Sequence, residues 1–140
     1  MEAHTATESG IIIFNVISGQ LRKKARLEVL LDDAYWPAFS TVRARSHNAQ
    51  WEYIGEGFVK ELDFGQVWLR LNDADEGDKD EIIAEYKGSA KDFLKDTLTG
   101  ATQFTLYDVE DPEKTSTVEL ETRYVPVHIT LEPRESVNSK

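Results

Sequence analysis

The sequence predicts an all-β fold, an eight-stranded antiparallel β-sandwich with one short helix between strands six and seven. Eight segments rich in β-branched and aromatic residues recur at regular spacing, and turn residues separate them. One segment carries apolar residues at helical spacing. With 140 residues, 40% of them hydrophobic, the chain is long enough for one domain with a single core. We expect residues 1–10 to form a disordered leader, residues 11–130 the domain, and residues 131–140 a linker to a following domain.

The strands in the first half of the chain end at turn residues. The eight strands are predicted at residues 11–17, 26–31, 38–44, 51–62, 67–71, 82–86, 102–109 and 115–125. The first is a β-branched run that Ser18-Gly19 is expected to stop, and the second ends at Asp32-Asp33. The fourth is interrupted by Gly55 and Gly57, where we expect a bulge or bend.

The third strand has an alternating pattern of charge. The two-residue period puts Thr41, Arg43 and Arg45 on one face, with Val42 and Ala44 on the other. This arrangement predicts a basic face on the third strand.

The second half contains the single helix and a closing hairpin. Ser89 is a good N-cap for a helix over residues 89–98, and Ala90, Phe93, Leu94 and Leu98 form an apolar stripe at helical spacing. We expect this stripe to pack on the sandwich. The last two strands are joined across an Asp-Pro-Glu turn.

Composition excludes several classes of protein. The net charge of −10 argues against a general nucleic-acid binder, because such a protein carries a broad basic face. The absence of cysteine excludes disulfides and thiolate metal sites, and it fits a cytosolic setting. The sequence has no apolar run long enough to span a bilayer and no signal-peptide pattern.

The most informative stretch is the acidic segment between strands five and six, residues 72–81, with six carboxylates in ten residues. Carboxylates that repel one another resist burial, so this loop faces water, a cation or a basic partner. Oxygen-rich loops suit calcium, which takes roughly 6–8 oxygen ligands, more than one loop usually supplies. The question is whether a second loop completes such a site.

Catalysis finds no support in the residues. His4, His47 and His128 are not spaced with one another or with carboxylates as a metal site or a catalytic triad requires. We therefore expect a protein that is not an enzyme and that has no cofactor.

Several motifs resemble one known family. Asn48-Ala49-Gln50-Trp51 resembles the Asn-Pro-x-Trp signature that opens the fourth strand of C2 domains, and residues 67–85 resemble that family's Asp-x-Asp calcium loop with its flanking strands. Further stretches resemble an internal C2 domain of the fungal tricalbins, which are relatives of the extended synaptotagmins. These stretches are residues 35–37, 55–58, 60–64 and 131–136.

The resemblance implies an eight-stranded sandwich with ion-facing and lipid-facing loops at one end. It implies one module of a longer, membrane-anchored tether at the cytosolic face of the endoplasmic reticulum, at contacts with the plasma membrane. The expected partners are anionic phospholipid and adjoining C2 domains of the same chain, with no nucleic acid.

The resemblance also places a calcium site, which this sequence leaves incomplete. Asp73 and Asp75 match the Asp-x-Asp pair, and Glu81 falls where a further aspartate usually sits. The facing loop, residues 20–25, has no carboxylate and carries three positive charges, with Ala25 near an expected aspartate. About half of the oxygens that calcium needs are therefore present, so we expect calcium independence. A cation of the facing loop is expected to act as counter-charge to the acidic loop.

The basic residues indicate a function more clearly than the incomplete calcium site does. The resemblance implies that they bind anionic lipid, because C2 domains often hold a phosphoinositide headgroup on a concave face. The candidate lipid-binding residues are Arg22, Lys23, Lys24, Arg43, Arg45 and Lys60. The alternative is that these are solvated charges balanced by Glu28, Glu52 and Glu56.

Two functions are left open by the residues. The first is a calcium-independent module that adds weak affinity for anionic lipid to a tether. The second is an interaction or spacer module that packs against neighbouring C2 domains through the aromatic cluster of Tyr35, Trp36 and Phe39. Trp51 and Trp68 are expected in the core.

Overall fold

The computed structural model describes residues 8–73 and 81–127, and in this part of the chain it contains eight strands and one helix. The strands are β1 (Ser9–Gln20), β2 (Arg26–Leu31), β3 (Phe39–Ser40), β4 (Asn48–Val59), β5 (Gln66–Asn72), β6 (Ile82–Ser89), β7 (Thr102–Asp108) and β8 (Thr115–Val127), with helix α1 (Ala90–Thr97) between β6 and β7. The predicted all-β fold is confirmed. β1 begins inside the range expected to be leader, and residues 131–140 lie outside the described residues.

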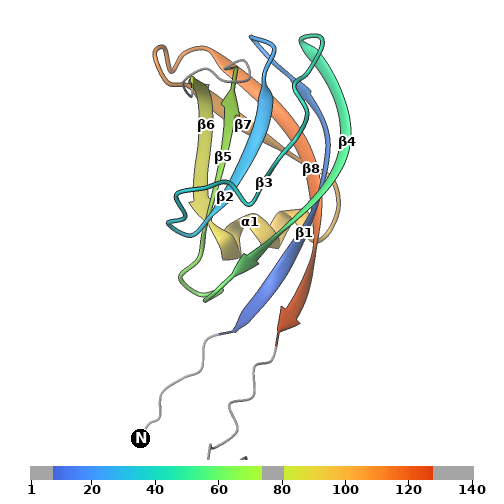
Figure 1. Cartoon of the computed structure of the whole chain (residues 1–140), viewed down its shortest axis with the longest axis vertical. Coiled ribbons are helices and arrows are strands. Elements are labelled where there is room, and N and C mark those ends of the chain that lie inside the picture. Colours follow the sequence, from blue (N-terminus) through green and yellow to red (C-terminus); the bar gives the residue numbers. More distant parts are fainter. Residues whose placement is uncertain (1–7, 74–80, 128–140) are drawn as a thin grey trace, which may run out of the picture.

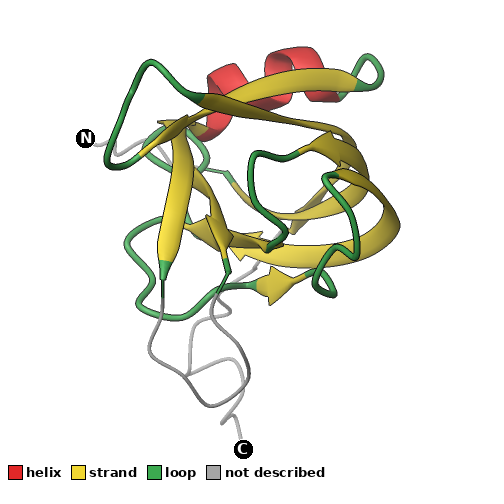
Figure 2. Cartoon of the chain, turned by 90° about the horizontal axis from the view of Figure 1, so that it is seen from above, coloured by secondary structure: helices red, strands yellow, loops and turns green. Residues whose placement is uncertain are grey.

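The strands form two layers. All pairs are antiparallel, in the order β3-β2-β5-β6-β7-β8-β1-β4, and β6 and β7 share only two residue pairs. The sheet folds over at this weak junction into a β2–β5 sheet (β3, β2, β5, β6) and a β1–β8 sheet (β7, β8, β1, β4), as Figures 1 and 2 show. No helix in the described residues has the length and apolarity to cross a bilayer.

The core lies between the layers. Alternate residues of β1 point inward, and Ile12, Phe14 and Val16 are fully buried. Phe93 of α1 packs between Phe14 and Phe104, with ring centroids 5.9 and 4.9 Å away. The helix therefore closes one side of the core, as Figure 2 shows.

Helix α1 follows the predicted capping pattern. The Ser89 hydroxyl accepts a hydrogen bond from the Asp92 N–H at 3.1 Å, which satisfies one free donor of the first turn. The predicted stripe is correct except at its end, because Leu98 is 48% exposed. Thr97 is buried instead, and its hydroxyl bonds the Thr122 hydroxyl at 2.8 Å.

Of the bulge or bend predicted at Gly55 and Gly57, the bulge is wrong. β4 pairs with β1 in continuous register through both glycines, and the irregularity lies at Glu52, whose φ is 45°. A Cβ at Gly55 would clash with the Phe39 ring, and one at Gly57 would clash with Leu31. Glycine is therefore needed here because the other layer approaches the backbone closely.

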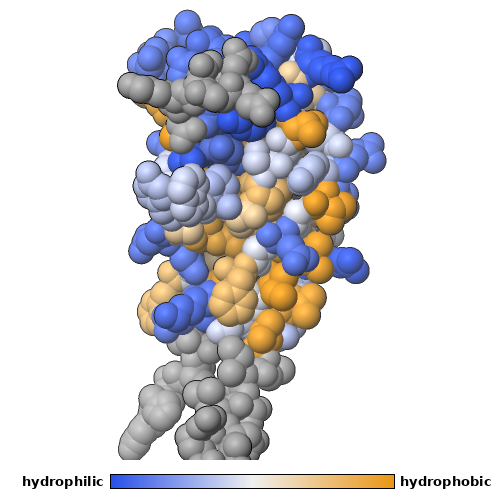
Figure 3. Space-filling view, in the orientation of Figure 1, coloured by the Kyte–Doolittle hydropathy of each residue, from blue (hydrophilic) through white to orange (hydrophobic). Residues whose placement is uncertain are grey.

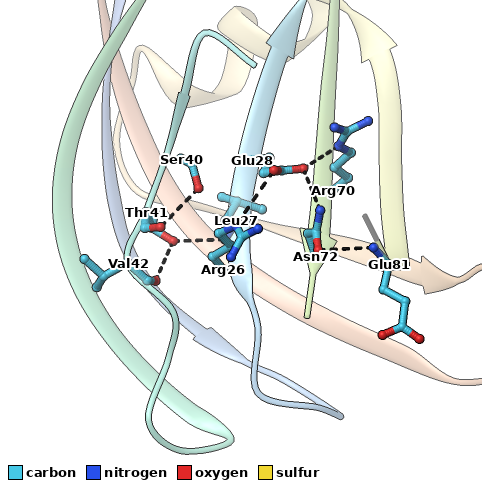
Figure 4. A network of polar contacts seen from close by, with 9 residues as sticks. All are labelled: Arg26, Leu27, Glu28, Ser40, Thr41, Val42, Arg70, Asn72 and Glu81. Carbon is cyan, nitrogen blue, oxygen red and sulfur yellow. Dashed lines mark hydrogen bonds and ion pairs between the residues drawn. The ribbon is translucent and has the colours of Figure 1, made fainter. Parts of the chain in front are cut away.

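Two other strand predictions need correction. β1 continues through Ser18-Gly19 to Gln20, because both of its neighbours continue to pair with it there. The third strand ends at Ser40, since the Thr41 hydroxyl accepts the Leu27 N–H at 2.9 Å in place of a backbone carbonyl (Figure 4). Thr41 and Ala44 are consequently buried, and the predicted two-residue alternation does not occur.

The antiparallel topology separates the loops into two ends. Residues 21–25, 41–47, 73–81 and 109–114 connect strands at one end, which we call the loop end. The β2–β3 and β4–β5 connections and both ends of the described chain lie toward the other end. In Figure 1 the β4–β5 connection and the chain ends are at the bottom, and the β2–β3 connection is higher, at the left.

Candidate membrane-facing site

The loop end gathers most of the predicted basic residues. Residues 21–25 and 41–47 are tied together by backbone and side-chain bonds, since Leu21 donates its N–H to the His47 carbonyl at 2.7 Å and the His47 ring contacts the Leu21 carbonyl at 2.9 Å. Arg43 reaches from one loop to the carbonyl of Lys24 in the other, at 3.4 Å. The resulting cationic loop surface consists of Arg22, Lys23, Lys24, Arg43 and Arg45, all of them exposed.

Lys60 does not belong to this surface. It follows β4, whereas Arg43 and Arg45 precede it, so the length of a twelve-residue strand, about 40 Å, separates them. Lys60 lines a cavity with Asp32, Asp33 and Glu61 at the opposite end of the sandwich.

Arg22 has a partner that the sequence did not indicate. Its guanidinium binds the Asp108 carboxylate at the end of β7, with Nη2 to Oδ2 at 2.7 Å. The Arg22 hydrogen bond, helped by the N–H groups of Glu110 and Asp111, lowers the pKa of Asp108 to about 2. Arg22 therefore joins the β1–β2 loop to the β7–β8 loop. Lys23, Lys24 and Arg45 make no ion pair with any residue that the structure describes.

The base of the acidic loop is anchored by a buried network, shown in Figure 4. Arg70 binds Glu28 across the β2–β5 pair, with Nε to Oε1 at 2.6 Å, and both side chains are buried. Asn72 is fully buried; it donates to the same Glu28 oxygen at 3.4 Å and accepts the Glu81 N–H at 3.3 Å. The network holds the two stems of the loop in place.

This network was not predicted from the sequence. In the alternative to lipid binding, Glu28 was to balance the candidate cations, whereas the structure pairs it with Arg70 and, at 3.8 Å, with Arg26. The available signal was the alternation of Arg26 and Glu28 in β2, and of Arg70 and Asn72 in β5, with apolar residues. Only the register shows that these residues are cross-strand partners.

The predicted metal ligands are only partly described. Asp73 is half-buried, and its Oδ1 is buried without a hydrogen-bond partner among the described residues. The Glu81 side chain is exposed, and Asp75 lies outside the described residues. Within residues 8–73 and 81–127, no three acidic or histidine side chains are grouped as metal ligands would be. Across the loop, Ala25 is fully buried and Arg22 supplies a cation, so this side does not fit a calcium ion.

The aromatic cluster divides between surface and core. Tyr35 and Trp36 are 82% and 74% exposed and meet edge to face at 4.9 Å, in the β2–β3 connection opposite the loop end. Phe39 instead packs inward on Phe14 at 5.2 Å.

The two tryptophans expected in the core also differ. Trp51 packs against the core, as predicted. Trp68 lies outside it on the β2–β5 sheet, with Lys87 and Arg70 over its ring at 4.5 and 4.8 Å, because its position in β5 points away from the other layer.

The comparisons with known proteins agree with this architecture. The chain is 29% identical to an uncharacterised protein of Schizosaccharomyces pombe over 136 residues, which is 94% of this chain and 9% of that protein. Among solved structures it is similar to C2 domain A of plant Extended Synaptotagmin 1, with a TM-score of 0.68, 16% identity and coverage of 86% of this chain and 97% of that one. It is also similar to a structure of Extended-Synaptotagmin 2 that contains its SMP domain and its C2 domains A and B. There the TM-score is 0.59, with 14% identity and coverage of 89% of this chain and 26% of that one.

At such identities the structural likeness shows the C2 fold alone. The family is shown by the sequence, because residues 4–130 match the family described as Tricalbin-1-like, C2 domain. The chain therefore belongs to the Tricalbin-1-like C2 domain family.

Proposed function

We propose that this domain is a calcium-independent C2 module of a membrane tether, and that it binds anionic phospholipid weakly through the cationic loop surface. Its family indicates a membrane-associated lipid-binding module. The observation that supports the finer proposal is the joining of two loops that present Lys23, Lys24 and Arg45 without ion-pair partners among the described residues.

The magnitude of this attraction suits a weak module. Each cation near an anionic membrane contributes about 1 kcal/mol, so Lys23, Lys24 and Arg45 together supply about 3 kcal/mol, which alone is weaker than millimolar binding. The net charge of −10, with acidic residues such as Asp73 and Glu81 near the same end, opposes this attraction and keeps it weak. Linked modules multiply such affinities, which is why a weak domain is sufficient in a tandem array.

Calcium independence is part of the proposal. The β1–β2 loop offers no carboxylate, and its cations would repel calcium across the gap. We further propose that the domain acts by binding, without catalysis or a cofactor. We place it at the cytosolic face of the endoplasmic reticulum, at plasma membrane contacts, as part of a longer membrane-anchored protein and beside adjoining C2 domains.

Co-sedimentation with phosphatidylserine and phosphoinositide vesicles, in calcium and in chelator, tests this function. We expect equal, salt-sensitive binding in both conditions. The triple variant Lys23→Glu, Lys24→Glu, Arg45→Glu should weaken binding by about a hundredfold or more. The matched control Lys60→Glu, at the opposite end, should bind like the unchanged chain. Calcium-dependent binding, or equal loss in the control, would contradict the proposal.

A second function is supported by the exposed Tyr35–Trp36 pair. Two large aromatic side chains at 82% and 74% exposure suit an interaction or spacer module that packs against a neighbouring C2 domain. In a longer chain with its adjoining domains, this function predicts slower hydrogen exchange in residues 32–38. Unchanged exchange there would count against it.

A further inference from the structure

A cavity of about 540 Å³ lies on the outer face of the β1–β8 sheet, away from the loop end. It covers two neighbouring outward rungs of the sheet. Asn15 and Glu121 are cross-strand partners in the first rung, and Ile13 and Arg123 are partners in the second. The turn after α1, residues 98–100, forms one wall.

The Glu121 carboxylate and the Arg123 guanidinium both line this cavity, and they do not form an ion pair with each other. Glu121 accepts a hydrogen bond from the Asn15 amide at 3.2 Å through Oε2, and its Oε1 has no partner among the described residues. Arg123 is exposed, and no ion pair or hydrogen bond joins its side chain to the part of the chain that the structure describes. Residues two apart on a strand are about 7 Å apart, so the two groups suit the two ends of a small dipolar ligand.

The remaining wall is apolar and exposed to water. Ile54 is 63% exposed and Leu98 is 48% exposed, although both are large hydrophobic residues. Beyond Ile13 the apolar surface continues, because Phe58, Ile11 and Val125 are cross-strand partners in the next outward rung. Figure 3 shows hydrophobic surface gathered toward the lower part of the molecule and hydrophilic surface at the loop end. A ligand that covers this wall therefore has an apolar part.

The surroundings of Glu121 favour a primary ammonium over a quaternary one. No aromatic ring is among the described residues that line the cavity, whereas quaternary ammonium groups are recognised by aromatic faces. The C-terminus of α1 adjoins the site, and its carbonyl groups and partial negative charge favour a cation that donates hydrogen bonds.

We propose that this cavity binds a phosphoethanolamine group that carries an apolar chain. The ammonium binds Glu121 beside the end of α1, the phosphate binds Arg123, and the chain lies over Ile13 and Ile54. An ester oxygen and two carbons separate phosphorus from nitrogen in this group, which suits two charges on successive outward positions of one strand.

The charge of the face selects a zwitterionic ligand over an anionic one. Glu56 and Glu119 also point outward from this sheet, and they disfavour an added net negative charge. The site is separate from the cationic loop surface, so this proposal does not depend on the function proposed above.

The test is a titration of the isotope-labelled 140-residue chain followed by amide NMR shifts. The probes are monomeric dihexanoyl-phosphatidylethanolamine, its phosphatidylcholine counterpart and free phosphoethanolamine. We expect saturable shifts in residues 13–15, 54, 97–100 and 121–123, with the ethanolamine lipid binding more tightly than the choline lipid. Arg123→Ala and Glu121→Gln should each weaken binding by about tenfold, because each removes one charge-assisted contact. The control Arg45→Ala, at the loop end, should leave it unchanged.

Comparison of the two ethanolamine probes identifies the source of the ligand. Tighter binding of the lipid than of free phosphoethanolamine, lost in Ile54→Glu, supports a lipid, whereas equal binding supports a soluble headgroup compound. Absence of saturable shifts in these residues would overturn the proposal, as would affinity that neither Arg123→Ala nor Glu121→Gln changes.

Discussion

Removal of the Arg70 side chain tests the buried network at the base of the acidic loop. In Arg70→Met the Glu28 carboxylate stays buried at 6% exposure and loses its 2.6 Å partner. Breaking a buried ion pair from one side costs about 3–5 kcal/mol in the free energy of unfolding. Arg26 at 3.8 Å and the Asn72 amide at 3.4 Å remain beside Glu28, so we expect the lower end, about 3 kcal/mol.

The double variant Glu28→Met, Arg70→Met distinguishes the cost of leaving a buried charge unpaired from the cost of changing the packing around Glu28 and Arg70. Replacing both partners with apolar side chains removes the buried charge, but it also removes the Glu28 acceptor of the buried Asn72 amide. We therefore expect the double variant to be more stable than Arg70→Met and within about 2 kcal/mol of the unchanged chain. The assay is equilibrium unfolding in urea. The unchanged chain, Glu28→Met, Arg70→Met and the double variant are compared using one common value for the dependence of the free energy of unfolding on urea concentration. Lys91→Met is the exposed control, because the Lys91–Asp63 pair is more than half exposed and contributes less than about 1 kcal/mol. A loss below about 1 kcal/mol in Arg70→Met, or a double variant less stable than it, would refute the reasoning.

Three further predictions concern single positions. Gly55→Ala should destabilise the domain by about 1–3 kcal/mol in urea unfolding, since its methyl group would meet the Phe39 ring; a neutral result would contradict the close approach. The pKa of Asp108 is lowered to about 2 by Arg22, so its stabilisation is complete above the unfolded pKa of 3.8 and is lost as the pH falls toward 2. In Asp108→Asn the free energy of unfolding should therefore fall less steeply as the pH is lowered from 3.8 toward 2. The same pH dependence in both chains would argue against the ion pair. Ser89→Ala should cost about 1 kcal/mol in thermal or urea unfolding, because it removes the cap of α1, whereas Ser89→Asp should retain most of the stability.

The local features that a sequence encodes were predicted well. The bounds of β2 match the prediction, and Ser89 caps α1 as its pattern indicated. These features depend on neighbours within a few residues, on side-chain period and on turn chemistry. The tied loops at the end of the sandwich also contain five of the six basic residues singled out.

The predictions that failed depend on contacts between distant segments. Gly55 and Gly57 do not form the expected bulge, because a sequence does not show that the opposite layer approaches the backbone there. Thr41 ends the third strand through a hydrogen bond to Leu27, fourteen residues away. Lys60 was expected to act with Arg43, yet the length of β4 keeps them apart.

The sequence by itself determined the fold class, the single helix and the position of the basic loop at residues 21–25, because each follows from residue type and local period. Only the tertiary structure decided which charges meet. Strand register made Glu28 and Arg70 buried partners, the packing of the loops brought Arg22 to Asp108, and the turn after α1 enclosed Glu121 and Arg123 in one cavity. Register arises from the packing of the whole sandwich, and a one-residue slip of β2 against β5 would turn Glu28 away from Arg70 to the other face.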